Sequence, residues 1–134
     1  MNNQLCLFPE EANYLSEKVL AKHYRSTGEI HYFANLFVNR RGELFSNRTG
    51  VMKKLKASES QGYNKFLFKR KNYLVHRIVA CTFLHNNDRE TKTQVDHLDG
   101  NKQNNHIFNL EWVTNGENQR RIKKNKDEKQ TVMF

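Results

Sequence analysis

The sequence predicts an α+β fold, with an N-terminal helix, a small antiparallel β region and a closing unit of strand, loop, strand and helix. Three observations lead to this prediction. A helical periodicity follows Pro9, short aromatic-rich segments separated by turn residues fill residues 30–75, and two apolar strands flank a long polar loop in residues 93–114. At 134 residues the chain is long enough for one domain that folds without disulfides.

The N-terminal helix is expected from Pro9 to the end of "AKHY" at Tyr24. Pro at the first turn followed by two acidic residues is typical of a helix start, and Ala12, Leu15 and Val19 fall on one helical face. The turn-forming "STGE" ends it. We therefore expect residues 1–29 to form a helical extension.

The β region is expected in residues 30–75, where apolar and aromatic segments alternate with turns. Arg41-Gly42 separates the first two segments, and a Lys-Arg-Lys turn separates the last two. The five predicted strand segments are residues 30–39, 43–47, 49–58, 65–68 and 72–75.

A helix is expected in "LVHRIVACTFL", because Val75, Ile78, Val79 and Phe83 form one continuous apolar stripe. The polar segment "HNNDRETKT" then connects it to the closing unit. Residues 30–92 are thus interpreted as a β-rich region plus a helix.

The closing unit is expected in residues 93–126. "TQVDH" and "NLEWVT" are predicted strands, and the "LDGNKQNNHIF" between them is a turn-rich loop with its tightest point at Asp99-Gly100. Thr114 and Glu117 match a capping box, so a helix begins there and places Asn118 in its first turn, four residues before Ile122. Residues 127–134 are left as a short tail.

Charge is the strongest compositional signal. The chain has 23 Lys and Arg against 14 Asp and Glu, a net charge of +9, so nucleic acid is the first expected partner and an anionic membrane surface the second. Cys6 and Cys81 are far apart and form no Cys-x-x-Cys pair, which argues against a thiolate zinc site and fits a reducing compartment. The start does not resemble a signal peptide and no segment reaches transmembrane length, so we expect a soluble, cytoplasmic protein that does not enter a membrane.

Chemistry is expected where the closing helix crosses the first strand of the unit. Asp96 and Asn118 would offer a carboxylate and an amide oxygen, a pair suited to Mg²⁺ or Mn²⁺ that water and substrate phosphate can complete. His97 supplies an imidazole, the side chain best suited to accept a proton near neutral pH. A base, a cation and surrounding positive charge together indicate phosphodiester hydrolysis.

The segments "VDH-LDGN-KQNN-HIFNLEWVTNGEN" and "YLVHRIVACTF" resemble the HNH (His-Me finger) nucleases, and in particular those of phage and intron homing endonucleases. The resemblance covers about residues 31–124. It implies a ββα-metal fold for the closing unit and a single divalent metal, Mg²⁺ or Mn²⁺ and not zinc. It also implies His97 as general base, Asp96 and Asn118 as metal ligands, and Asn109 as the residue that braces the loop holding the base.

Further residues are candidates for contact with DNA. The basic ones are usually a solvated face, but here they either cluster among aromatic strands or continue from the proposed catalytic turn. His76 and His106 are possible phosphate contacts, although a partly buried, hydrogen-bonded His76 and a solvated His106 are the simpler alternatives. Asp99, Asn101, Asn104 and Asn105 are interpreted as turn formers. The basic candidates are Lys69, Arg70, Lys71, Arg120, Arg121, Lys123 and Lys124.

The leading hypothesis is a metal-dependent endonuclease acting on double-stranded DNA, either a homing-type nickase or a restriction-type cutter, with a homodimer as one route to double-strand cleavage. Its expected setting is the cytoplasm of a bacterial host or phage-infected cell. A catalytically inactive DNA-binding or regulatory module on the same scaffold is the alternative. An RNA-binding protein is a third, weaker one.

Overall fold

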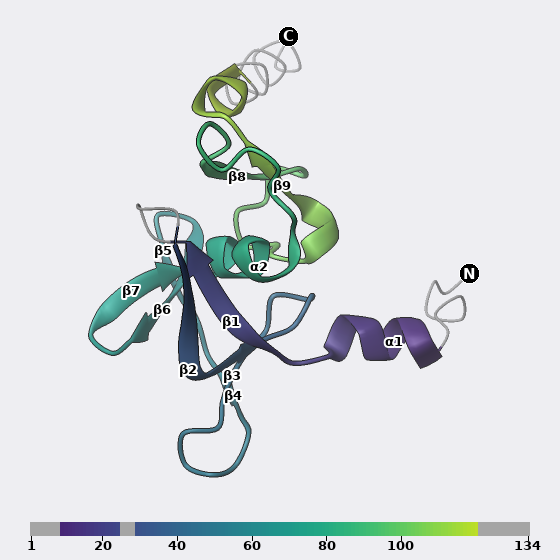
Figure 1. The fold of residues 1–134 in the computed structure, drawn as a ribbon, viewed down its shortest axis with the longest axis vertical. Helices are drawn as coiled ribbons and strands as arrows, with labels where there is room; N and C mark the ends of the chain where they lie inside the picture. Colours follow the sequence, from purple (N-terminus) through teal and green to yellow (C-terminus); the bar gives the residue numbers. More distant parts are fainter. Residues whose placement is uncertain (1–8, 25–28, 121–134) are drawn as a thin grey trace, which may run out of the picture.

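The computed structural model describes residues 9–24 and 29–120, in which three antiparallel sheets surround one central helix (Figure 1). The sheets have the strand orders β1-β2-β3-β4, β5-β6-β7 and β8-β9. The elements are α1 (Pro9–Ser16), β1 (Val19–Tyr24), β2 (Ile30–Val38), β3 (Leu44–Ser46), β4 (Lys53–Leu55), β5 (Ser58–Ser60), β6 (Tyr63–Phe68), β7 (Lys71–Leu74), α2 (Val75–Phe83), β8 (Gln94–His97), η2 (Ile107–Asn109) and β9 (Leu110–Val113). This arrangement confirms the predicted α+β class.

The predicted N-terminal helix is wrong in its second half. Helix α1 ends at Ser16, and the residues from Val19 to Tyr24 form strand β1, which pairs antiparallel with β2. Ala21 is fully buried and the backbone N–H of Lys22 donates to Thr82 Oγ1 at 3.0 Å, so β1 also contacts α2. Cross-strand pairing and core packing outweigh the helical periodicity of this short segment.

The predicted β segments are confirmed, with one refinement. Residues 49–58, expected to form one short strand, contribute β4 and the first residue of β5, which belong to different sheets. The turn between β2 and β3 runs from Asn39 to Glu43, and Gly42 adopts a φ of 85° there. The buried Asn39 side chain stabilises this turn, because its Oδ1 accepts the backbone N–H groups of Arg41 and Glu43 at 3.1 and 3.0 Å.

Helix α2 is the centre of the core. It contacts strands of all three sheets. Val75, Ile78 and Val79 of the predicted stripe are almost completely buried, and Phe83 is half-buried. Phe33 of β2 and Trp112 of β9 pack in the same cluster. Burial of each such side chain stabilises the fold by about 1.5–3 kcal/mol, so α2 fixes the positions of the surrounding strands.

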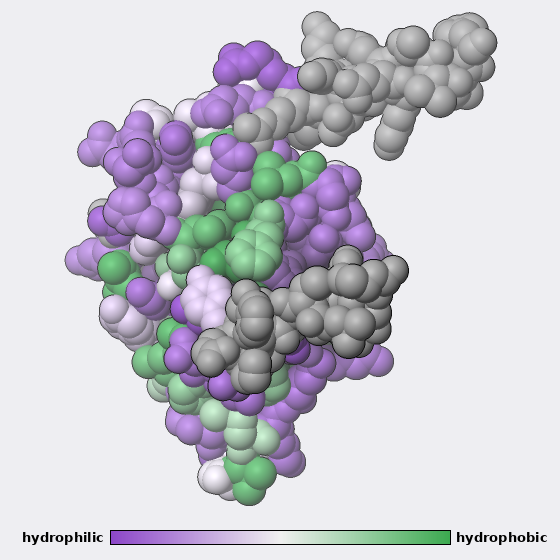
Figure 2. Space-filling model, turned by 90° about the vertical axis from the view of Figure 1, so that its right-hand side faces the viewer, coloured by the Kyte–Doolittle hydropathy of each residue, from purple (hydrophilic) through white to green (hydrophobic). Residues whose placement is uncertain are grey.

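Hydrophilic residues cover much of the face shown in Figure 2, and a hydrophobic patch lies near its middle. Among the described residues, no helix is both long and apolar enough to span a membrane.

Candidate active site

The hairpin of β8 and β9 carries the predicted Asp-His pair at the end of β8. Val95 lies opposite Trp112, and Asp96 lies opposite Glu111. Val95 and His97 are buried, whereas Asp96 is half-buried. Because side chains alternate along a strand, Asp96 and His97 leave β8 on opposite faces.

His97 is held on the inner face. It is only 7% exposed, and its Nε2 lies 2.9 Å from Oδ1 of Asn105. Since an amide oxygen can only accept, Nε2 carries the ring proton and Nδ1 is the nitrogen that can accept one. The rings of His76 and Tyr63 pack beside it, with centroids 4.8 and 6.1 Å from that of His97.

Asn109 organises the loop that follows His97. Its Nδ2 donates to Asp99 Oδ1 at 2.8 Å and to the carbonyl of Asn104 at 2.9 Å, and its Oδ1 accepts the backbone N–H of Asp99 at 2.9 Å. Its own carbonyl accepts the N–H of Leu98 at 2.8 Å. The hydrogen bonds from Asn104, Asn101 and Asn109 lower the pKa of Asp99, so its carboxylate remains an acceptor. The geometry therefore suits the bracing role that the resemblance implies for Asn109.

The closing helix begins as the capping box predicts. Thr114 Oγ1 accepts the N–H of Glu117 at 3.1 Å, and Glu117 Oε1 accepts the N–H of Thr114 at 3.3 Å. Residues 115–120 are helical. The predicted continuation through Ile122 to residue 126 lies outside the described residues.

Gln94 connects this helix to β8. Its Nε2 donates to Asn115 Oδ1 at 2.9 Å, and its Oε1 accepts from Asn118 Nδ2 at 2.7 Å. Gln94 and Asp96 are two residues apart on the strand and share a face. The structure thus brings Asn118 to the face of β8 that carries Asp96.

The two expected metal ligands fit a hard cation. The amide nitrogen of Asn118 is used by Gln94, so its Oδ1 is the atom left to bind a cation, alongside the Asp96 carboxylate. Oxygen donors of this kind suit Mg²⁺ or Mn²⁺, which complete their shells with water or phosphate. No cluster of three or more His, Cys, Asp or Glu suited to a metal occurs within residues 9–24 and 29–120.

His76 is more deeply buried than the simpler alternative described. It is 5% exposed, and its Nδ1 has no hydrogen-bond partner in the described part of the chain. Burial, together with the neighbouring His97 and Arg77, lowers the pKa of His76 to about 3. His76 is therefore neutral at physiological pH and could meet a phosphate only as a neutral donor.

His106 caps η2, because its Nδ1 accepts the backbone N–H of Phe108 at 3.3 Å. Burial and the nearby Arg41 lower its pKa, so it too favours the neutral form. Its ring packs against that of Phe108, which is 70% exposed. The solvated loop histidine expected as the simpler alternative is thus a half-buried capping residue.

Four of the basic candidates lie in the described residues, on an exposed turn and on the surface of the closing helix. Lys69 and Arg70 form the tip of the β6–β7 hairpin with φ values of 49° and 67°, and Lys71 opens β7. Arg120 is exposed in the closing helix. Arg121, Lys123 and Lys124 lie outside the described residues.

Sequence reasoning missed several residues around His97. Asn105, interpreted as a turn former, is buried against His97, and Tyr63 packs on the ring. Lys102 places its Nζ 4.7 Å from the centre of the Tyr63 ring. Tyr63 lies in β6, whereas His97, Lys102 and Asn105 lie at the end of β8 and in the loop after it. Because these segments are far apart in the sequence, no local pattern marks the contacts between them.

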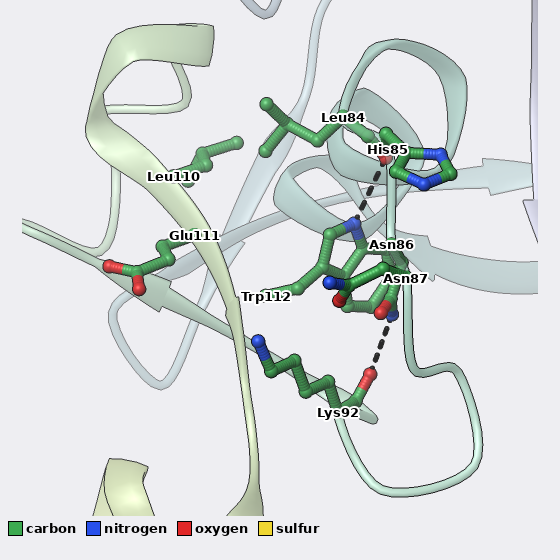
Figure 3. Close-up of a pocket in the computed structure, with 8 residues that line it drawn as sticks. All are labelled: Leu84, His85, Asn86, Asn87, Lys92, Leu110, Glu111 and Trp112. Atoms are coloured by element: carbon green, nitrogen blue, oxygen red, sulfur yellow. Dashed lines mark hydrogen bonds between the residues drawn. The ribbon is translucent and has the colours of Figure 1, made fainter.

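A pocket of about 220 Å³ lies between β9 and the segment that follows α2 (Figure 3). Trp112 points toward the segment from Leu84 to Lys92 and donates from Nε1 to the carbonyl of Leu84 at 3.2 Å, while Glu111 points away. None of the predicted site residues lines this pocket. The candidate site is therefore the end of the β8–β9 hairpin.

A buried histidine at the end of β8, an asparagine-braced loop and a helix packed across the hairpin define a ββα unit of the nuclease type. Residues 73–120 match the family model described as HNH endonuclease. The resemblance inferred from the sequence is confirmed.

Two curated relatives and one solved structure agree with this resemblance. The chain is 40% identical over 84 residues to an HNH endonuclease of Acanthamoeba polyphaga mimivirus, covering 60% of this chain and 21% of that protein. It is 40% identical over 95 residues to DNA endonuclease I-HmuI of Bacillus phage SP01, covering 66% and 53%. A solved structure that describes DNA binding and cleavage by the HNH homing endonuclease I-HmuI is similar with a TM-score of 0.59 at 28% identity, covering 85% of this chain and 66% of that one. The chain thus spans about a fifth to about half of these two curated relatives.

Proposed function

We propose that this protein is a metal-dependent DNA endonuclease that hydrolyses phosphodiester bonds. The observation that carries the proposal is the orientation of His97, whose Nε2 faces Asn105 Oδ1 and whose Nδ1 is thereby left as the proton acceptor. The match of residues 73–120 to the HNH endonuclease family model and the likeness to a DNA-cleaving homing endonuclease support it.

In this mechanism His97 acts as general base. Its Nδ1 takes a proton from the water that attacks the scissile phosphorus, while the bond to the leaving oxygen of the sugar breaks. Asn109 holds the loop after His97 and so keeps the base in place.

Asp96 and Asn118 would hold the divalent cation. When bound, Mg²⁺ or Mn²⁺ would supply positive charge where negative charge develops on the phosphate and the leaving oxygen. Because Asp96 and His97 leave β8 on opposite faces, the two would approach one phosphate from different sides at the end of the strand. An Asn ligand is neutral, so the site should bind metal weakly and need millimolar Mg²⁺.

The basic residues would contact the DNA backbone. Lys69, Arg70 and Lys71 project from the β6–β7 turn, and Arg120 lies on the helix that also carries Asn118. We assign Arg121, Lys123 and Lys124 to the same role from their sequence alone. Such contacts position the duplex and are sequence-independent.

The test is a comparison of cleavage and binding by the wild-type protein. Supercoiled plasmid is incubated with Mg²⁺, Mn²⁺ or EDTA, and binding to a short DNA duplex and to single-stranded RNA is measured at several salt concentrations. The proposal predicts metal-dependent cleavage and stronger binding to duplex DNA. Open circles as first product would indicate a nickase, and linear DNA a paired cutter. DNA binding without cleavage in any metal would instead favour the inactive binding module.

A further inference from the structure

Asn105 is the residue whose position is hardest to explain by loop formation alone. It is only 5% exposed and lies eight residues beyond His97, on the opposite side of the loop. Neighbouring Asn101 and Asn104 use their side chains for bonds within the loop, to the N–H of Gln103 and the carboxylate of Asp99. Asn105 instead directs its side-chain oxygen to the ring of His97.

The hydrogen bond between His97 and Asn105 sets the ring orientation of His97, which ring packing alone does not set. His76 and Tyr63 contact His97 through their rings and restrict where its ring lies. A half-turn of an imidazole about its Cβ–Cγ bond keeps nearly the same shape but exchanges nitrogen for carbon at each position. Packing therefore does not distinguish the two orientations, whereas an amide oxygen 2.9 Å from Nε2 does.

Asn105 is itself held by the turn between β2 and β3. A Cβ atom added at Gly42 would lie 2.8 Å from both the Cβ and the carbonyl oxygen of Asn105, so this turn and the loop are in close backbone contact. The N–H of Ile107 also donates to the carbonyl of Arg40 at 2.8 Å. The β2–β3 turn, more than sixty residues away in sequence, thus supports the residue that faces His97.

We propose that Asn105 is a positioning residue that fixes the ring orientation and the tautomer of His97, and that the turn at Gly42 holds Asn105 in place. The inference deepens the proposed function and rests on it, since it concerns the nitrogen that accepts the proton. Asn105 would act through His97 and would not touch the substrate.

The test replaces Asn105 in the full chain. Asn105→Leu keeps the shape but removes the acceptor, and Asn105→Asp keeps an acceptor oxygen. Asn101→Leu, an exposed asparagine of the same loop, is the matched control. Folding of each variant is checked by circular dichroism before use.

The first readout is the nitrogen NMR spectrum of the His97 ring at about pH 8.5, where an ordinary imidazole is neutral. Wild type, Asn105→Asp and Asn101→Leu should show the proton on Nε2, and Asn105→Leu should show a mixture of both tautomers. Gly42→Ala should shift the spectrum the same way to a smaller extent, and it serves as the second variant if Asn105→Leu does not fold. A wild-type spectrum in Asn105→Leu or in Gly42→Ala would overturn the inference.

The second readout is DNA cleavage. Asn105→Leu should lower kcat at least tenfold with KM within about twofold, and Asn105→Asp should recover most of the loss. Equal changes in Asn105→Leu and Asn101→Leu would reduce Asn105 to a structural residue. If the tautomer depends on Asn105 but wild-type protein cleaves no DNA, the positioning role stands and the proposed function fails.

Discussion

Asp96 and His97 are consecutive residues at the end of β8, yet their side chains lie on opposite faces of the hairpin. Asp96 shares its face with Gln94 and lies opposite Glu111, whereas His97 packs against His76. Gln94 in turn binds Asn118, the other expected ligand. Strand β8 therefore carries the expected metal ligand Asp96 on one face, the cation face, and the proposed base His97 on the other, the base face. Substitutions can probe the two faces independently.

The cation face is tested through Asn118. Asn118→Ala should remove metal-dependent cleavage while DNA binding in EDTA remains, because an oxygen ligand is lost. Gln94→Ala should have a milder effect and raise the Mg²⁺ concentration for half-maximal cleavage several-fold, since Asn118 loses its anchor. Gln103→Ala, an exposed glutamine in the loop, is the control. Unfolding of Asn118→Ala would show that Asn118 is structural.

Because the pKa of the buried His76 is lowered, we expect the stability of the fold to depend on pH. Its pKa is about 3 in the folded protein and about 6.5 in an unfolded chain, so below pH 6.5 the unfolded state binds a proton that the folded state does not. Stability is therefore full above pH 6.5 and falls as the pH falls toward 3, by roughly 2 kcal/mol between pH 7 and pH 5.

Urea unfolding of wild type and His76→Phe at both pH values measures this effect. Lowered pKa values of His23 and His106 act in the same direction and are common to both proteins. The variant should lose about 2 kcal/mol less than wild type on acidification. Equal losses would mean that His76 is protonated in the folded protein.

Asn109 should be important for stability as well as activity. Asn109→Ala removes three part-buried side-chain hydrogen bonds, two to Asp99 and one to the carbonyl of Asn104. A loss of roughly 1–3 kcal/mol in the free energy of unfolding is expected, with loss of cleavage. Asn101→Ala, which removes one exposed local bond, should cost far less. Similar losses in both variants would contradict the bracing role.

The β6–β7 turn should contribute to DNA affinity through charge alone. Lys69 and Arg70 have φ values that Asn tolerates well, so Lys69→Asn, Arg70→Asn and Lys71→Ala remove the charges without straining the turn. The combined variant should bind all DNA sequences more weakly and reduce the salt slope of the association constant by about 0.9 for each phosphate that the protein no longer neutralises. A variant with Lys and Arg exchanged at these positions should keep the slope. Weakening confined to one DNA sequence would indicate base contacts instead.

Local patterns predicted most of the fold. The stripe of Val75, Ile78 and Val79 and the capping box of Thr114 and Glu117 were readable because each element is specified by residues three or four apart. The pattern wrongly predicts helix for β1 because Val19 continues the helical spacing of Ala12 and Leu15, which do lie in α1. Its partner strand β2 comes later in the chain, and no local pattern shows that pairing.

The candidate site also depends partly on local patterns. Asp96 and His97 stand out in the sequence because they are adjacent, and Asn118 because the capping box marks the helix start before it. Asn105 could not be distinguished from the other asparagines of its loop, since its burial depends on Gly42, in the distant turn between β2 and β3. The neutral state of His76 likewise follows from burial that only the folded chain creates.

The measurement that tests the central claim most directly is the rate of plasmid cleavage by wild type and His97→Ala under identical Mg²⁺ conditions. Removal of a general base should lower the rate on the order of a hundredfold or more, while binding to the same DNA in EDTA stays within about twofold. A variant that cleaves as fast as wild type would show that His97 is not the base, and the account of this site would be wrong.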